Sequence, residues 1–132
     1  MKKGFTLIEL LAVITILGII STIATVNFIK LKENSSKELL DTKIKNLEAA
    51  AIVYGQENQD KLNFSCIVNE TEYSYCIKVS VKTLIDKNYF KSTEIGSSGS
   101  VNLINNVTKE SMLDDEVQIY RKNNSIYAKY IE

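Results

Sequence analysis

One ionisable side chain stands inside the most apolar segment of this chain. Glu9 is the single charged residue within the 25 residues 5–29. A carboxylate in the apolar part of a membrane-spanning helix costs about 2.5 to 3.5 kcal/mol on insertion scales, so such residues are usually paired or functional. The plainer alternative is that Glu9, near the start of the segment, extends toward lipid headgroups. Glu9 is therefore the first candidate for chemistry, and that chemistry would be the pairing of a charge.

The other residue types point away from catalytic and metal sites. Histidine is absent, and cysteine occurs only at Cys66 and Cys76. No cluster has the spacing of metal ligands, and no serine or cysteine has a histidine base to activate it. Asp114, Asp115 and Glu116 favour a solvated acidic turn; a calcium loop is the weaker alternative, because no further oxygen ligands are spaced to complete it. We expect no catalytic residue, no metal and no cofactor, and therefore not an enzyme.

Length and charge limit the remaining classes. The 132 residues have room for one compact domain at most. The 16 basic residues balance 16 acidic ones, and no basic block is interleaved with aromatic residues. Because binding to nucleic acid depends on a concentrated positive surface, we expect no nucleic acid as the primary partner.

The apolar segment 5–29 is long enough to span a membrane. As a helix it would be roughly 37 Å long, and the hydrocarbon core of a bilayer is about 30 Å thick. Lys2 and Lys3 precede the segment, which favours a cytoplasmic N-terminus and an outward-facing remainder. An ordinary cleaved signal peptide would have a shorter apolar core followed by a small-residue cleavage site. We therefore expect an anchor that is retained.

The start of the segment carries a specific motif. Residues 2–9 read KKGFTLIE. Here the chain resembles the type IV pilin family, whose N-terminal signature is a glycine followed by Phe-Thr-Leu-Ile-Glu or a close variant. The resemblance implies that a prepilin peptidase removes the leader, residues 1–4, by cutting between Gly4 and Phe5, and that the new amine of Phe5 is N-methylated. It also implies that Glu9 meets the N-terminal amine of a neighbouring subunit during assembly, an ion pair that sets register more than stability.

The same anchor departs from the family in one respect. Many pilins carry a proline further along this helix, whereas the present chain has none. A glycine near Gly18 is common in the family, and glycine tolerates close packing or local unwinding. Helix flexibility is therefore expected at Gly18 and in the hydroxyl-rich residues that follow it.

Helical periodicity continues from the anchor through residues 30–58. Apolar residues recur there at spacings of three and four, which predicts one core-facing stripe: Leu40, Ile44, Leu47, Ala51 and Tyr54. Two arrangements fit. A continuous helix would run from Phe5 to about Glu57; a break at residues 33–36 would let a serine cap a second helix. Continuity is favoured, since no proline interrupts the pattern.

Residues 59–132 change period and predict a β-rich head. Residues 62–68 and 73–79 read as a hairpin, with residues 69–72 as its turn. Cys66 and Cys76 are symmetric about residue 71, so a tight odd-length turn there would set them directly across the two strands. A disulfide is favoured over two buried free thiols. A helix capped by Ser80 follows, and residues 117–121 and 125–131 predict a second hairpin.

These elements predict an α+β fold, in which the C-terminal half of a long N-terminal helix packs on a small antiparallel sheet. The resemblance implies a structural subunit of a type IV pilus, serving adhesion, motility or related functions. Its partners would be the prepilin peptidase, other copies of itself, other pilins, an assembly platform in the membrane and, before assembly, membrane lipid. It would be inserted in the cytoplasmic membrane and then reach the cell surface in the pilus. The alternatives are a pseudopilin of a type II secretion or competence system and, less favoured, a membrane-anchored binding domain.

Overall fold

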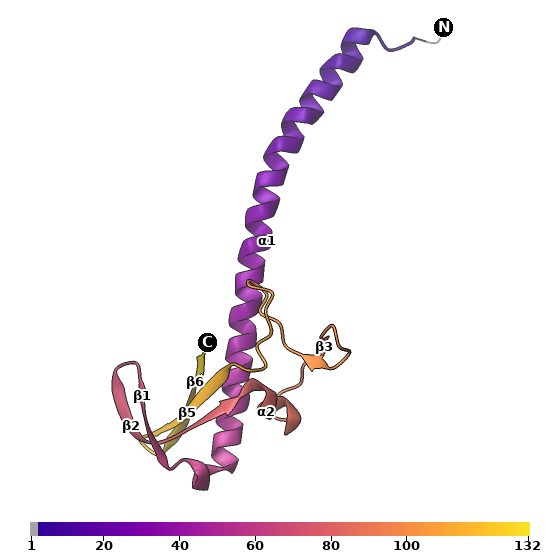
Figure 1. The fold of residues 1–132 in the computed structure, drawn as a ribbon. Coiled ribbons are helices and arrows are strands. Elements are labelled where there is room, and N and C mark those ends of the chain that lie inside the picture. Colours follow the sequence, from indigo (N-terminus) through magenta and orange to yellow (C-terminus); the bar gives the residue numbers. More distant parts are fainter. Residues whose placement is uncertain (1–2) are drawn as a thin grey trace. The chain divides into compact units, whose positions relative to one another are not determined.

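The computed structural model describes residues 3–132, so Met1 and Lys2 of the expected leader lie outside the described residues. The first element is α1, an uninterrupted helix of 51 residues from Leu7 to Glu57 (Figure 1). It passes through residues 33–36 without the alternative break. By contacts the chain divides into two compact units, Met1–Lys37 and Glu38–Glu132, and each is described by itself.

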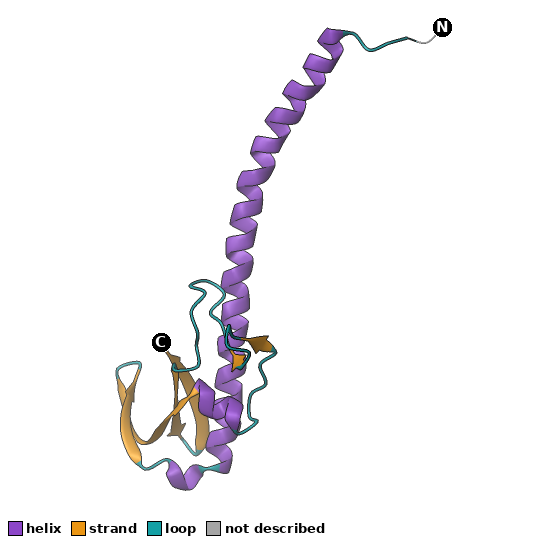
Figure 2. Ribbon diagram, turned by 45° about the vertical axis from the view of Figure 1, so that its right-hand side comes forward, coloured by secondary structure: helices purple, strands orange, loops and turns teal. Residues whose placement is uncertain are grey.

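The unit Glu38–Glu132 contains the end of α1 and all the strands. After α1 come a short 3-10 helix η1 (Gln59–Lys61), β1 (Phe64–Val68), β2 (Thr71–Ser80) and α2 (Val81–Asp86). The chain continues with β3 (Glu94–Ile95), β4 (Val101–Asn102), β5 (Glu116–Lys122) and β6 (Ser125–Ile131) (Figure 2). β1, β2, β5 and β6 form an antiparallel sheet in that order, while β3 and β4 pair separately. The expected α+β class is confirmed.

One face of the four-stranded sheet packs on the last five turns of α1. Strand residues alternate between the two faces, and Val79, Val117 and Ile119 on this face are buried. From α1 the predicted stripe meets them: Leu47, Ala51 and Tyr54 are buried, with Leu40 and Ile44 packed against the same cluster. A further contact comes from a residue outside the stripe. A Cβ on Gly55 would lie 2.6 Å from Cγ2 of Ile119 and 2.9 Å from Cγ2 of Ile126, so only glycine lets the helix approach the sheet this closely.

Two-residue turns close both predicted hairpins. Asn69 and Glu70 join β1 to β2, and Asn123 and Asn124 join β5 to β6; all four have positive φ, between 47° and 66°. This is the type I′ geometry, whose twist matches that of the flanking strands. The first turn is therefore centred between residues 69 and 70, and the odd-length turn about residue 71 is wrong.

The expectation that Cys66 and Cys76 lie directly across from one another is wrong as well. Cys66 is opposite Tyr73, and Cys76 is opposite Phe64. With a regular two-residue hairpin the two cysteines would project from opposite faces, because Cys76 is three positions after Tyr73 and side chains alternate. The register shifts by one residue between these pairs, as in a β-bulge, and returns both cysteines to one face. They form a disulfide with a Cα–Cα distance of 6.0 Å.

Removing this disulfide should weaken the unit Glu38–Glu132. The double variant Cys66→Ser/Cys76→Ala is expected to lose about 2 to 3 kcal/mol of unfolding free energy, because the unfolded chain regains the freedom of a small closed loop. Thermal unfolding followed by the near-ultraviolet circular dichroism of tyrosine measures this loss. A reducing agent should lower the melting temperature of the unsubstituted protein and leave that of the variant unchanged. Equal melting temperatures of the two proteins under oxidising conditions would contradict the prediction.

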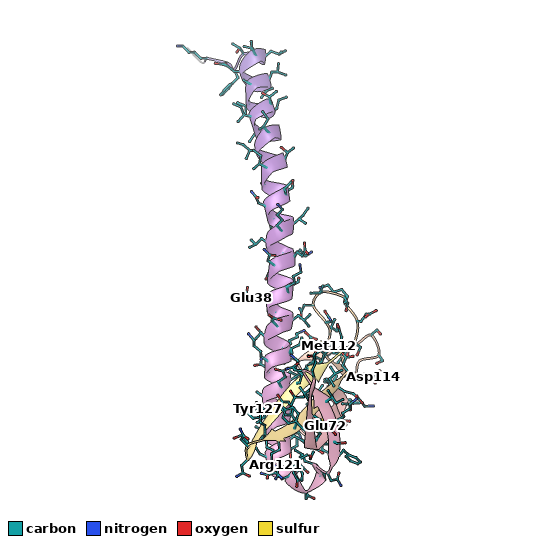
Figure 3. All side chains as sticks on the ribbon, turned by 90° about the vertical axis from the view of Figure 1, so that its left-hand side faces the viewer. Glu38, Glu72, Met112, Asp114, Arg121 and Tyr127 are labelled. Atoms are coloured by element: carbon teal, nitrogen blue, oxygen red, sulfur yellow. A yellow bond between two sulfur atoms is a disulfide. The ribbon has the colours of Figure 1, made fainter. Side chains whose placement is uncertain are left out.

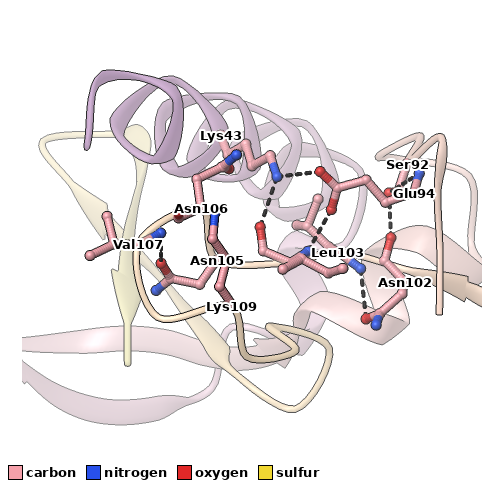
Figure 4. Close-up of polar contacts among 10 residues, drawn as sticks. Lys43, Ser92, Glu94, Asn102, Leu103, Asn105, Asn106, Val107 and Lys109 are labelled. Carbon is pink, nitrogen blue, oxygen red and sulfur yellow. Dashed lines mark hydrogen bonds and ion pairs between the residues drawn. The ribbon is translucent and has the colours of Figure 1, made fainter. Parts of the chain in front are cut away.

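A partly buried ion pair attaches the long segment between α2 and β5 to α1 (Figure 4). Lys43 on α1 pairs with Glu94 on β3 and also donates to the carbonyl of Ile104 at 2.7 Å. The second oxygen of Glu94 accepts the Ile104 N–H. Asn105 then accepts the N–H groups of Val107 and Thr108 at 2.8 and 3.1 Å, which holds the following turn. Side-chain bonds thus replace regular secondary structure in ordering this segment.

This attachment should depend on pH. Burial opposes ionisation of Glu94, but the bonds from Lys43 and Ile104 outweigh burial and hold its pKa below the ordinary value of 4.5. A carboxylate whose pKa is lower in the folded state stabilises the fold above its unfolded pKa, and this stabilisation disappears as the pH falls through the folded pKa. Glu94→Gln should therefore cost about 1 kcal/mol at neutral pH, since the pair is partly exposed, and progressively less as the pH falls below 4.5 toward the lowered pKa of Glu94.

Melting temperatures measured from pH 3 to pH 7 test this dependence. Glu110→Gln is the matched control, because Glu110 is exposed and forms no ion pair with the residues that the structure describes. The control should follow the unsubstituted protein at every pH. A constant difference between Glu94→Gln and the unsubstituted protein across this range would show that the charge of Glu94 is not what matters.

Candidate functional site

The helix start is built by two side chains of the motif. Thr6 directly precedes α1, and its N–H and hydroxyl both donate to Oε2 of Glu9, at 2.8 and 2.9 Å. The N–H of Glu9 in turn donates to the hydroxyl oxygen of Thr6 at 3.3 Å. This reciprocal pair is a capping box, which satisfies backbone N–H groups that a helix start leaves without partners. Glu9 thus has a local structural role that the sequence analysis missed, although its signal, a threonine three residues before a glutamate, is local.

The bond between Gly4 and Phe5 lies just before this cap. Residues 3–6 have no regular secondary structure, and all are exposed. A Cβ placed on Gly4 would meet no atom within 4 Å, so the fold itself does not require glycine there. The structure therefore presents this peptide bond in an irregular, accessible stretch, the form in which a peptide bond can enter a protease cleft.

The first unit offers an apolar surface on every side of α1. Every residue from 7 to 35 is exposed, and among the residues that the structure describes α1 is the one helix long and apolar enough to cross a membrane (Figure 3). The hydroxyls within it are satisfied: Thr15, Ser21, Thr22 and Thr25 each donate to a carbonyl three or four residues earlier. The helix therefore presents little polar surface to a neighbour. An exposed apolar surface of this extent marks a membrane or subunit contact.

Gly18 lies in regular helix within this surface. A Cβ there would meet no atom within 4 Å, so nothing in a single copy of the chain requires glycine at this position. Flexibility or close packing at Gly18 remains a prediction about the assembled state.

The predicted residues fall into two groups. Glu9 lies close to the Gly4–Phe5 bond in the sequence and is held at the helix start by Thr6, while Cys66 and Cys76 meet in the β1–β2 hairpin. For residues 3–132, the structure brings together no group of three or more His, Cys, Asp or Glu side chains that would suit a metal ion. Asp115, in the acidic turn, instead accepts the hydroxyl of Tyr130.

Comparison with known proteins adds two findings. The family model described as the prokaryotic N-terminal methylation motif matches residues 1–25. A type IV major pilin protein, PilA of Myxococcus xanthus (strain DK1622), is 38% identical over 73 residues, which cover 55% of this chain and 32% of the relative. The match thus spans about a third of the relative's length. No solved structure matches the chain significantly.

The motif, the helix that follows it and the antiparallel sheet agree with one another. The methylation motif covers the capped helix start and most of the exposed apolar segment. The relative's match extends over more than half of the chain. By these features, the N-terminal part of this chain is similar to type IV pilins: it carries the prokaryotic N-terminal methylation motif and is similar in sequence to a type IV major pilin.

Proposed function

We propose that this chain is the structural subunit of a type IV pilus. Prepilin peptidase cuts between Gly4 and Phe5, the amine of Phe5 is N-methylated, and the mature chains polymerise through the apolar surface of residues 5–29. The observation that carries the proposal is this surface, exposed on all sides of α1 and beginning with the matched motif. The role is structural and not catalytic.

Glu9 acts as the assembly charge in this proposal. Cutting generates a positively charged amine on Phe5, and the low dielectric of a helix-packed core strengthens its attraction to a carboxylate. The capping box supports the role because it holds Oε2 of Glu9 in a fixed position at the start of α1. A carboxylate buried without this partner would be strongly unfavourable, so the pair selects the correct register between neighbours.

The partners and location follow from these steps. The chain first sits in the cytoplasmic membrane with the unit Glu38–Glu132 outside, in contact with lipid and with an assembly platform. It then joins other copies and other pilins in a filament on the cell surface, and this filament mediates adhesion or motility. A pseudopilin of a type II secretion or competence system would share processing and assembly, but its short filament would stay within the envelope.

Mass spectrometry and electron microscopy together test the proposal. The mature protein should lack residues 1–4 and carry one methyl group on Phe5, and gold-labelled antibody should mark long filaments sheared from the cell surface. Gly4→Val is the control. A Cβ at this position meets no atom within 4 Å, so a loss of cleavage in this variant would come from poorer recognition by the peptidase and not from misfolding. An unprocessed chain would overturn the pilin role, and a processed chain found only in the envelope would favour the pseudopilin.

A further inference from the structure

The face of the four-stranded sheet that points away from α1 is hollowed. Two adjoining hollows of about 320 and 530 Å³ share Lys78 and Gln118 in their lining. We name them together the outer groove, with Phe64, Ile67, Glu72, Lys78, Gln118 and Ile131 as its principal lining residues. The register shift in the β1–β2 hairpin accompanies this concavity, because a bulge bends the strand that carries it.

Gln118 gives the outer groove an unused hydrogen-bonding group. The residue is only 6% exposed, and its amide makes no hydrogen bond to any other residue in the described part of the chain. Its neighbours across the sheet are Lys78 and Lys129, which share its face. Among the described residues the one fully buried side-chain polar atom without a partner is Asn106 Oδ1, so the Gln118 amide is not sealed off: it lines the outer groove, where a ligand or solvent can bond to it. Apolar walls formed by Phe64 and Ile67, both largely exposed, surround it.

In contrast to the hollowed outer groove, the β3–β4 hairpin projects from the unit Glu38–Glu132. Ile95 and Val101 face each other in its register and are 68% and 49% exposed. Between them residues 96–100 form a tip of glycine and serine only, closed by the N–H of Gly96 donating to the Ser100 carbonyl at 2.9 Å. The tip is narrow because its side chains are small, and its serine hydroxyls can both donate and accept hydrogen bonds. The apolar base of the hairpin therefore matches the apolar walls of the outer groove, and its polar tip matches the polar floor formed by Gln118.

The two features lie on opposite sides of the same unit. In Figures 1 and 2 the β1–β2 hairpin and the β3–β4 hairpin flank α1 from different sides. A projection on one side and a hollow on the other cannot meet within one copy. A projection and a hollow on different sides are the two halves of a heterologous contact, the type of contact that, when it does not close into a ring, continues from subunit to subunit into a helical filament.

Charge is complementary between the two sides. Glu70 and Glu72 lie at the tip of the β1–β2 hairpin, exposed and without an ion pair among the described residues. Lys82 and Lys91 flank the β3–β4 hairpin; Lys82 lines a hollow together with Val101, and Lys91 leads into β3. Opposite charges at the rim of a contact steer association and select partners.

We propose that the β3–β4 hairpin of one copy docks in the outer groove of a second copy, so that neighbouring subunits interlock outside the helical core. Ile95 and Val101 pack against Phe64 and Ile67, and the serine tip satisfies the amide of Gln118. Lys82 and Lys91 lie near Glu70 and Glu72 of the neighbour. The proposal rests on the assembly of this chain into filaments, and it adds a second contact to the one made by residues 5–29.

Site-specific photo-crosslinking in assembled filaments tests this contact. A benzophenone amino acid replaces Ile95 in the full chain, filaments are sheared from the cells and irradiated, and crosslinked peptides are identified by mass spectrometry. The expected product is a covalent dimer joining residue 95 to a peptide from the outer groove. The same amino acid at Val107, an exposed apolar residue outside the β3–β4 hairpin, is the matched control and should give no such peptide.

A charge exchange provides an independent readout. Lys82→Glu or Glu72→Lys alone should lower the yield of sheared filaments about two- to fivefold, as expected for a rim ion pair. The double variant should recover the yield. Filaments that form normally but give no crosslink to the outer groove, or a crosslink elsewhere, would overturn the docking while leaving the pilus role intact. If the unsubstituted protein formed no filaments, the pilus role would fail and the docking with it.

Discussion

Glu9→Ala is expected to abolish filament formation while leaving removal of residues 1–4 largely intact. The substitution removes the only carboxylate within residues 5–29, so the amine of an incoming Phe5 would enter the apolar core without a partner. An uncompensated buried charge costs about 3 to 5 kcal/mol, which corresponds to a loss of assembly of two orders of magnitude or more. The measurements are the mass of the membrane-bound chain and the amount of the chain in sheared filaments.

Two further variants separate the charge of Glu9 from its capping bond. Glu9→Gln retains an oxygen that can accept the bonds from Thr6 but carries no charge. Thr6→Ala retains the charge but loses the side-chain half of the capping box, which should cost about 1 kcal/mol of local helix stability. We expect Glu9→Gln to fail in assembly like Glu9→Ala, and Thr6→Ala to reduce filament yield only partly. Normal filaments from Glu9→Gln would refute the role of the charge and leave capping as the function of this residue.

Leu47→Ala should cause the largest loss of stability in the unit Glu38–Glu132. Leu47 is fully buried between α1 and the sheet, and truncation of a buried leucine to alanine typically costs about 2 to 5 kcal/mol because of lost transfer energy and the cavity left behind. For a domain of this size each kcal/mol lowers the melting temperature by about 4 to 8 °C. The seven tyrosines of the chain all lie in this unit, so near-ultraviolet circular dichroism in detergent reports its unfolding selectively.

Leu39→Ala is the matched control on the same helix. Leu39 is 52% exposed, and the same chemical change there leaves no cavity, so the melting temperature should fall by at most a few degrees. Leu47→Ala should leave processing at Gly4 unchanged, since that bond lies outside the unit. A similar loss of stability in both variants would mean that the helix face was assigned wrongly.

Several features of this protein could be predicted from the sequence because each depends on residues close together in the chain. The helix α1, its buried stripe, the α2 cap at Ser80 and the two hairpins all follow from periodicity and turn composition. The motif at residues 4–9 is likewise a linear pattern. Even the capping box of Thr6 and Glu9 was available locally, and it was missed because Glu9 was considered only as a charge to be paired.

The tertiary structure decided the rest. The disulfide between Cys66 and Cys76 depends on one residue of register shift, and residue counting alone placed the turn about residue 71. Lys43 meets Glu94 across 51 positions, and Glu48 accepts the N–H of Tyr130 across 82. Such partners leave no periodic trace in either segment, because each contact depends on where the packed core brings two distant backbones together.

The sequence by itself thus determined the functional features of the N-terminal segment: an accessible glycine–phenylalanine bond, a carboxylate at the helix start and an apolar helix after it. These properties need only neighbouring residues and the hydrogen bonds of a single helix. The tertiary structure alone decided the shape of the outer face, where the bent β1–β2 hairpin makes a groove and the β3–β4 hairpin makes a projection. The physical reason is that a surface is formed by side chains from several strands, and their relative positions follow from packing against α1.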